Sequence, residues 1–235
     1  MIDKSITHDK TLPIPVKGRG TGITLEALTL NRCLDIEKLK AAGWQNFKYL
    51  DKPAVLIPYK NEKSEIVRSR LRLNLNKEDG ERFKWGKGDM ILPYGLANLS
   101  WIHEQGYCIL VEGEVDTEVL FQSGFPALGI PGAATWKSEW AKYLPEMTVF
   151  CWQESDEAGK NFSHLVAKDF SHQGNNNEKW GTLLVIPAPL EAKDAARLKI
   201  LYGKDFKSKI ESLIDINNCH YAVSVFPPAA GFEIP

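Results

Sequence analysis

Two acidic clusters each follow an apolar run that has the length of a buried strand. Glu112 comes directly after 107–111 (YCILV), and Glu154 and Asp156 follow 147–152 (MTVFCW). If both runs are strands of one parallel sheet, their carboxyl ends meet at the edge where ligands collect, and the clusters converge. Clustered carboxylates repel one another unless a cation neutralises them, and hard oxygen ligands favour Mg²⁺ or Mn²⁺. The pattern predicts a divalent-metal site for phosphoryl-transfer chemistry on nucleic acid.

A simpler interpretation is that these carboxylates lie beside helix N-termini, where the helix dipole favours negative charge, and are solvated. This interpretation accounts well for Glu118 and Glu157, to which we assign no role. It accounts less well for Glu112, because that residue stands between apolar Val111 and small Gly113 in a tight turn. We therefore favour the metal site on the pattern as a whole.

Glycines accompany the acidic clusters. Gly113 allows the chain to turn sharply after Glu112 and allows a ligand to approach the backbone. The segment 129–133 (GIPGA) predicts a rigid turn at the same edge of the sheet. Two interpretations of that turn are equally good: a backbone floor for phosphate or metal, or an ordinary connection from a strand to a helix.

The elements that must position these residues alternate between strand and helix from residue 107 onward. Apolar runs predict four strands, over 107–111, 125–130, 147–152 and 182–187. The stretches between and after these strands predict helices near 137–142, 157–170, 191–201 and 205–214. Apolar runs separated by helices are typical of parallel strands covered on both faces. We expect an α/β fold with a four-stranded, mostly parallel sheet flanked by helices.

A small helical and antiparallel-β subdomain is expected before this sheet. Apolar spacing over 25–42 predicts one or two short helices that end near Gly43. Three short strands follow, over 54–59, 66–75 and 81–85, with hairpin turns between them.

The hairpin region is basic although the whole chain is not. The chain has a net charge of −1, but residues 52–87 hold ten Lys or Arg against five Asp or Glu, a local net charge of +5. Alternation in the strand places Arg68, Arg70 and Arg72 on one face, about 7 Å apart, a spacing suited to a phosphate backbone. Arg82 and Lys84 add to this charge.

Aromatic residues close to these arginines are candidates for stacking on bases: Phe83, Trp85 and Tyr94. The alternative is a half-buried sheet with a solvated face, and for an isolated hairpin that interpretation is the better one. We favour a nucleic-acid or nucleotide surface because an acidic metal site is predicted in the same chain.

Several classes of protein are excluded by what the sequence lacks. Four widely spaced cysteines without a CxxC pair argue against zinc and against a disulfide framework, which favours a reducing, cytoplasmic compartment. The five histidines show no ligand spacing. No apolar run is long enough to cross a membrane, and no GxxxxGK[ST] loop indicates a helicase or ATPase engine.

The acidic segments together resemble a known family. VEGEVDTEVLFQSGFPALGIPGA and VFCWQESDEAG are similar to the Toprim domain, the metal-dependent catalytic fold of bacterial-type primases and topoisomerases. The resemblance covers about 105–200. Upstream, AVLIPYKNEKSEIVRSRLRL and RFKWGKGDMILPYGL resemble the basic subdomain that precedes Toprim in primases of phages, plasmids and integrated mobile elements. Downstream, IPAPLEAKDAARL resembles the stretch where a Lys-Asp pair is usual.

The resemblance implies roles for individual residues. Glu112 matches the catalytic glutamate, which is proposed as general acid or base and metal ligand. The other implied residues are metal ligands at Glu154, Asp156 and Asp194, a metal ligand or its supporting partner at Asp116, and a nucleotide-binding Lys193. Two positions depart from the family pattern: Glu154 stands where many members have Asp, and Arg197 stands where primases often carry a further acid.

The resemblance also implies a domain organisation and a function. We expect a flexible arm over 1–22, a basic primase-type subdomain over 23–104, a Toprim-like catalytic domain over 105–216 and a C-terminal tail over 217–235. The implied activity is synthesis of short RNA primers in DNA replication, with Mg²⁺ or Mn²⁺ and no zinc. The implied partners are single-stranded DNA, nucleoside triphosphates and a replicative helicase domain or protein, with no membrane.

Two alternatives stay open, a Toprim nuclease and a non-catalytic nucleic-acid-binding module of a replication protein. The two departures from the family pattern make the second one credible. A topoisomerase is disfavoured because those enzymes need a strand-attacking tyrosine on a separate large domain.

Overall fold

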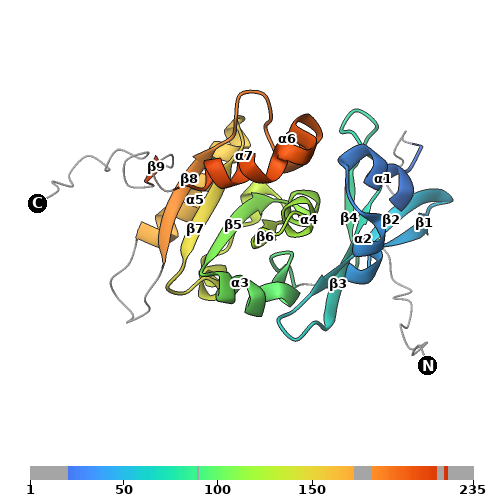
Figure 1. The fold of residues 1–235 in the computed structure, drawn as a ribbon. Coiled ribbons are helices and arrows are strands. Elements are labelled where there is room, and N and C mark those ends of the chain that lie inside the picture. The colour runs from blue at the N-terminus through green and yellow to red at the C-terminus, as the bar shows by residue number, and fades with distance from the viewer. Residues whose placement is uncertain (1–20, 89, 172–180, 216–219, 222–235) are drawn as a thin grey trace, which may run out of the picture. The chain divides into compact units, whose positions relative to one another are not determined.

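Figure 1 shows the computed structural model of the chain, in which residues 21–88, 90–171, 181–215 and 220–221 are described. The chain divides into two compact units, Met1–Ile91 and Leu92–Pro235. The arm expected over 1–22 and the tail expected over 217–235 lie almost wholly outside the described residues. These two segments, and the boundary expected after residue 104, stay predictions.

The first unit begins with two short helices whose ends are fixed by capping residues. α1 (Leu25–Arg32) follows Thr24, whose hydroxyl accepts a backbone hydrogen bond from the first turn. α2 (Ile36–Ala42) follows Asp35 and ends at Gly43, which adopts φ +98°. A capping side chain satisfies an N–H that the helix leaves unpaired, and glycine tolerates the left-handed conformation at the other end. The helix end predicted at Gly43 is confirmed.

A four-stranded antiparallel sheet completes the first unit. Its strands pair in chain order: β1 (Gln45–Tyr49), β2 (Lys52–Lys60), β3 (Ile66–Arg72) and β4 (Phe83–Trp85). β1 was not predicted, because most of its side chains are exposed and alternation is therefore weak. A small core on this sheet consists of Tyr49, Ala54 and Leu71, with Phe47, Leu56 and Leu73 packed against it.

The second unit is built on a sheet of order β6-β5-β7-β8-β9. Four strands are parallel and β9 is antiparallel at the edge; the strands are β5 (Tyr107–Glu112), β6 (Ala127–Ile130), β7 (Thr148–Gln153), β8 (Thr182–Pro187) and β9 (His220–Tyr221). The central positions of β5, β7 and β8 are buried, as expected for strands covered on both faces. The predicted α/β fold and its four parallel strands are confirmed.

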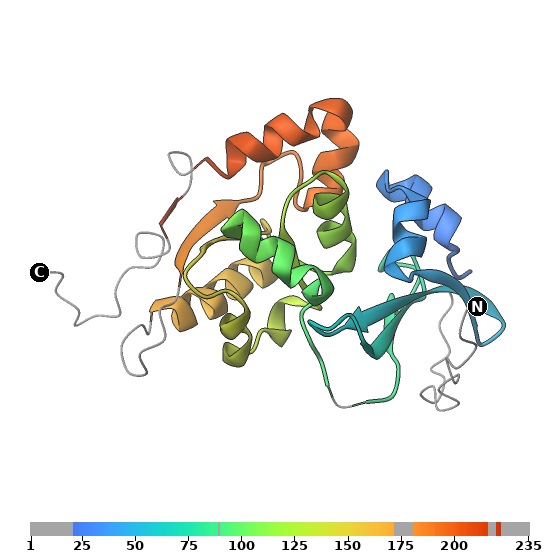
Figure 2. The ribbon, with the colours of Figure 1, turned by 60° about the horizontal axis from the view of Figure 1, so that its bottom comes forward.

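Helices cover both faces of this sheet. In Figures 1 and 2, α7 and α5 lie on opposite faces. The helices of this unit are α3 (Leu99–Gln105), α4 (Glu114–Gln122), α5 (Glu157–Ser171), α6 (Ala195–Tyr202) and α7 (Phe206–Leu213), with short 3-10 turns η1 (Leu96–Asn98), η2 (Ala133–Thr135), η3 (Ser138–Tyr143) and η4 (Gly203–Asp205). The long helix predicted over 157–170 and the two later helices are confirmed.

The helix predicted near 137–142 is a 3-10 helix, η3, rather than an α-helix. Its buried aromatic residues Trp140 and Tyr143 are three positions apart. A 3-10 helix has three residues per turn and places such positions on the same face. The 3-10 helix buries both rings, although an α-helix also brings positions three apart to one face.

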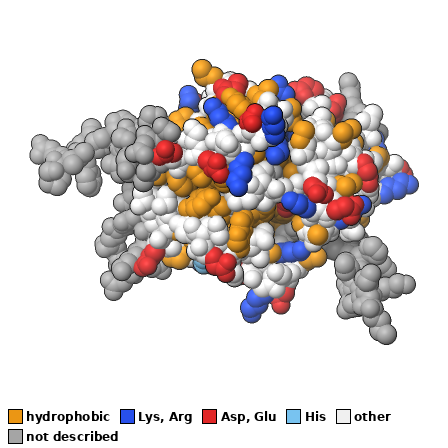
Figure 3. All heavy atoms as spheres, in the orientation of Figure 1, with side chains coloured by type: hydrophobic (Ala, Val, Ile, Leu, Met, Phe, Trp, Pro, Cys, Tyr) orange, Lys and Arg blue, Asp and Glu red, His pale blue; other side chains and the backbone are white. Residues whose placement is uncertain are grey.

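The surface in Figure 3 carries Lys, Arg, Asp and Glu side chains interspersed, which agrees with the net charge of −1. Every helix in the described part of the chain is too short or too polar to cross a membrane.

Candidate active site

Glu112 is the last residue of β5 and lies at the carboxyl edge of the parallel sheet. Gly113 follows it with φ +98°, and a Cβ at Gly113 would have no described atom within 4 Å. The glycine therefore provides the sharp turn that was expected and leaves the backbone open on that side. The Glu112 side chain is half-buried, and its Oε1 atom is buried without a hydrogen-bond partner among the described residues.

Burial and neighbouring carboxylates disfavour the ionised form of Glu112. Loss of solvent and, to a smaller extent, the negative charges of Glu154 and Asp156 raise its pKa, Lys193 and the backbone N–H of Ala133 act against this, and the net result is a pKa of about 7. β5 and β7 are parallel neighbours, so Glu112 and the Glu154–Asp156 cluster leave the sheet at the same edge. With a pKa of about 7, Glu112 can hold or release a proton near neutral pH.

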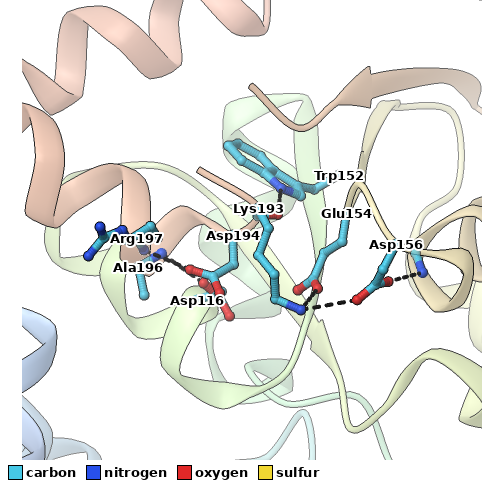
Figure 4. Close-up of polar contacts among 9 residues, drawn as sticks. Asp116, Trp152, Glu154, Asp156, Lys193, Asp194, Ala196 and Arg197 are labelled. Carbon is cyan, nitrogen blue, oxygen red and sulfur yellow. Dashed lines mark hydrogen bonds and ion pairs between the residues drawn. The ribbon is translucent and has the colours of Figure 1, made fainter. Parts of the chain in front are cut away.

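Lys193 joins the two acids of the second cluster (Figure 4). Its Nζ atom lies 2.6 Å from Glu154 Oε2 and 3.2 Å from Asp156 Oδ2. The Glu154 side chain is only 11% exposed, whereas the Lys193 and Asp156 side chains are 52% and 50% exposed. The largely buried carboxylate is thus compensated by an ammonium group that itself remains half in solvent.

The ionisation of these three groups follows from their surroundings. Burial raises the pKa of Glu154, and the Lys193 ammonium offsets this only in part. The backbone N–H of Gly159 and then Lys193 hold the pKa of Asp156 below its usual value against partial burial. Burial lowers the pKa of Lys193, but Glu154 and Asp156 outweigh it and the pKa lies above its usual value.

Gly159 fits the start of α5 tightly against the second cluster. Its N–H donates to Asp156 Oδ1 at 3.0 Å. A Cβ on this glycine would lie 2.7 Å from Glu154 Cβ and closer still to the Glu154 carbonyl oxygen. The spacing from Glu154 to Gly159 therefore has a structural reason, because only glycine lets the helix begin at this distance from the acid.

Asp116 and Asp194 both hold the N-terminus of α6. Asp194 is its N-cap and accepts from Arg197 N at 2.7 Å, and Asp116, on α4, accepts from Ala196 N at 2.8 Å. These bonds match the simpler interpretation of strand-end acids as helix caps. The metal-binding roles expected of Asp116 and Asp194 stay predictions.

Trp152 contributes a contact that was not predicted. Its indole N–H donates to the carbonyl oxygen of Lys193 at 3.1 Å. Together with the two bonds at the start of α6, this contact fixes the backbone that carries Lys193 (Figure 4). An N-cap pattern of Asp at position 194 before helical residues signals the cap, but no sequence signal reveals the indole contact.

The donor set suits a hard divalent ion in chemical type. Glu112, Glu154 and Asp156 supply carboxylate oxygens, and Glu112 Oε1 is a buried oxygen that still needs a partner. Within the described ranges, however, no group of three or more His, Cys, Asp and Glu side chains is already arranged to hold a metal ion. Glu154 and Asp156 are drawn together by Lys193 instead, so an ion could share them only if that ammonium moved.

The basic face of the first unit is a layer of arginines on aromatic rings. The guanidinium carbon of Arg68 lies 4.7 Å from the Trp85 ring centroid, and that of Arg70 lies 4.0 Å from the Phe83 ring. Register places these residues on one face, since Arg70 pairs with Trp85 across β3 and β4. Such stacking orients the guanidinium planes.

Arg72 is more deeply buried than Arg68 and Arg70, although the guanidinium of Arg68 also donates to carbonyl oxygens, those of Gly86 and Met90. It is 4% exposed, and its guanidinium donates to the carbonyl oxygens of Asn74 and Leu75 at 2.7 Å and 2.6 Å. A side chain buried in this way does not reach a phosphate. The nucleic-acid role expected of Arg72 therefore does not fit the structure, and its contacts stabilise the turn after β3.

Three further predicted positions have different environments. Lys84 pairs with Leu71, on the opposite face of β4 from the aromatic rings, and forms an ion pair with Glu81 at 3.6 Å. Arg82 is exposed at the start of β4. Tyr94 is 6% exposed and donates to Glu118 Oε1 at 2.5 Å, so its predicted stacking on bases is wrong.

Comparison with known proteins identifies the fold. The structure is similar to the E. coli primase catalytic core, with a TM-score of 0.61 and 15% sequence identity. The match covers 80% of the present chain and 72% of that core. A DnaG catalytic core gives a TM-score of 0.62 at 14% identity, and the match covers 84% of the present chain and 73% of that core. A chain in the structure of bacteriophage T7 lagging-strand DNA polymerase interacting with primase domains gives a TM-score of 0.55 at 19% identity. The match covers 86% of the present chain and 97% of that chain. The fold therefore resembles that of primase catalytic cores.

Sequence comparison reaches less far. No protein-family model matches the chain. The gene 57 protein of Mycobacterium phage D29 is 31% identical over 97 residues, which are 41% of this chain and 57% of that protein. The chain thus spans little more than half of that relative. The expected primase-like fold is confirmed, and the individual site residues stay predictions.

Proposed function

We propose that this chain is a primase-like nucleotidyltransferase that makes short RNA primers on single-stranded DNA. The observation that supports the proposal is that Glu112 ends β5, and Glu154 and Asp156 follow the end of its parallel neighbour β7, at one edge of the sheet in a primase-core-like fold. Ligands of open parallel sheets bind at this edge. Phosphoryl transfer depends on positioning and on neutralising phosphate charge, and grouped acids contribute by holding the divalent ions that neutralise it.

In this proposal the three acids divide the work. Glu154 and Asp156 bind a divalent ion, Mg²⁺ or Mn²⁺, and Asp116 and Asp194 hold α6 in place beside it or add ligands. A bound ion would polarise phosphoryl oxygens and favour attack on the α-phosphate. Glu112, with a pKa of about 7, accepts the proton of the attacking hydroxyl or contributes its unpartnered oxygen to the ion.

The first unit supplies the nucleic-acid surface. Arg68, Arg70 and exposed Arg82 provide positive charge, and Phe83 and Trp85 provide rings beneath or beside it. Phosphate contacts of arginine give affinity, and aromatic rings accept bases with little regard to sequence. The partners are then single-stranded DNA and nucleoside triphosphates, with unwinding supplied by a replicative helicase domain or protein.

A primer-synthesis assay tests the proposal. The protein is mixed with single-stranded DNA, four ribonucleotides (one of them labelled) and Mg²⁺ or Mn²⁺, and products are resolved on a denaturing gel. Glu112→Gln is expected to lower the rate of primer synthesis by about 100-fold or more, which is the usual contribution of a general base. Asp156→Asn is also expected to lower this rate strongly. Glu157→Gln, an exposed acid next to Asp156, serves as the matched control.

The possible results separate the candidate activities. Short labelled products that disappear in Glu112→Gln and persist in Glu157→Gln support primer synthesis. Metal-dependent shortening of the template would identify a nuclease instead. Neither product nor shortening with either ion would refute catalysis by this chain alone.

One observation favours a non-catalytic nucleic-acid-binding module as the second candidate. Lys193 already compensates part of the negative charge of Glu154 and Asp156, so the two acids have a cationic partner without a metal ion. A module of this kind binds single strands in a salt-sensitive way. Fluorescence anisotropy with labelled single-stranded DNA would then give the same affinity in EDTA and in Mg²⁺, and the same affinity for Glu112→Gln.

A further inference from the structure

The Lys193 ammonium stands where a cation is needed. It lies 2.6 Å from Glu154 Oε2 and 3.2 Å from Asp156 Oδ2, so one positive group bridges two acids from the end of the same strand. Glu154 is 11% exposed and could not keep its charge cheaply without a partner. The lysine therefore supplies part of the positive charge that a bound divalent ion would bring to the two carboxylates.

The position of this lysine is built into the fold. Trp152 donates to its carbonyl oxygen, and the next turn of chain is held by Asp194 and Asp116 at the start of α6. Three hydrogen bonds therefore fix the backbone at and directly after Lys193. The side chain beyond it is different, because 52% of its surface is exposed and four methylene groups connect the ammonium to the backbone.

A divalent ion and this ammonium cannot share the acids at short distance. Two cations a few ångströms apart repel each other strongly in a partly buried site. The ion can gain Glu154 and Asp156 only if the ammonium rotates away, and the exposed, flexible side chain allows that rotation while the backbone stays in place. The two acids then have a cationic partner in both states.

We propose that Lys193 is a resident competitor for the divalent ion: it holds Glu154 and Asp156 together in the metal-free protein and leaves them when the ion binds. This inference rests on the proposed metal site. It gives Lys193 a positioning role toward the acids, and it implies that the affinity of the site for the ion is set partly by the strength of the lysine contacts.

A Mn²⁺ titration of the full chain tests the competition directly. Lys193→Met keeps the length of the side chain and removes the charge, and Lys207→Met, an exposed lysine on α7, controls for the change in net charge. Removing a charge-assisted competitor is expected to tighten Mn²⁺ binding by about tenfold, or about 1.4 kcal/mol. Lys207→Met is expected to bind Mn²⁺ like the wild type.

The outcomes distinguish this inference from the proposed function. Saturable binding by the wild type that is unchanged or weaker in Lys193→Met overturns the competition and leaves the metal site intact. No saturable binding by wild type or Lys193→Met at millimolar Mn²⁺ overturns the metal site and the competition together. Tighter binding by Lys193→Met supports both.

A second measurement needs no variant and so survives a folding defect in Lys193→Met. The wild-type protein is treated briefly with an amine-acetylating reagent in EDTA and in saturating Mn²⁺, and labelled peptides are quantified by mass spectrometry. The competition predicts faster labelling of Lys193 with Mn²⁺, because the released ammonium is no longer held by two acids, and equal labelling of Lys207. Equal or slower labelling of Lys193 would overturn it.

Discussion

In the metal-free protein, Glu112→Gln is expected to gain stability relative to wild type as the pH rises toward neutrality. Burial raises the pKa of Glu112 from 4.5 to about 7, so the folded protein resists ionisation of a group that the unfolded chain ionises freely. Between these two values the folded state binds more protons than the unfolded state. Stability contributed by the protonated form is therefore present below pH 4.5 and is lost as pH rises to about 7.

The size of the effect follows from the shift. A change from 4.5 to about 7 corresponds to about 3.4 kcal/mol if the carboxyl were fully shielded from water. Glu112 is only half-buried, and solvent screening reduces this to about 1–2 kcal/mol. Glutamine has no such ionisation, so the variant should gain about this much relative to wild type on going from pH 5 to pH 8.

Urea unfolding in EDTA at several pH values between 5 and 8 measures the effect. Glu157→Gln, which alters an exposed acid, is expected to follow the wild-type curve. The quantity to compare is the change with pH, since the new amide can alter stability equally at every pH. A difference between Glu112→Gln and wild type that does not vary with pH would refute the reasoning, because Glu112 would then be as freely ionised in the folded protein as in the unfolded chain.

Three other predictions concern the supports of the site and the basic face. Gly159→Ala places a methyl group against the Glu154 backbone and is expected to cost about 1–3 kcal/mol by urea unfolding. Asp194→Ala removes the cap of α6 and is expected to cost about 1 kcal/mol in the same measurement, whereas Asp194→Asn should cost much less because asparagine also caps. Arg70→Ala is expected to reduce the slope of log affinity for single-stranded DNA against log salt concentration by about one phosphate contact. Arg72→Ala is expected to lower stability and to leave this slope unchanged. Anisotropy titrations over a salt series measure the slope for both variants.

The parallel sheet was predictable because its strands are buried on both faces. Continuous apolar runs such as 107–111 mark strands of this kind without need of alternation, and the intervening helices indicate parallel pairing. β1 was not predictable by the same means, since it is a partly exposed strand with little apolar signal. The 3-10 geometry of η3 also escaped prediction, because one buried pair of rings three residues apart suits either kind of helix.

At the site, the sequence predicted which strand ends carry the acids but not what each acid contacts. The ends of β5 and β7 determine where Glu112 and Glu154 lie, and the apolar runs in the sequence predicted both strand ends. The partners depend on packing between distant segments: the lysine that bridges Glu154 and Asp156 comes from a loop 37 positions after Asp156. Arg72 shows the same limit on the basic face, where alternation gives the side of the sheet but not the depth of burial.

The contacts rank the acids by what they can still bind. Asp156, Asp194 and Asp116 each accept a backbone N–H at the start of a helix, and Glu154 accepts from Lys193. Glu112 differs, because its Oε1 atom is buried and has no donor in the described part of the protein. A buried oxygen without a donor is costly to the fold, so its retention requires a gain elsewhere. A cation, or a hydroxyl proton taken from a substrate, would satisfy this oxygen, and the other acids would then act mainly by holding that ligand beside it.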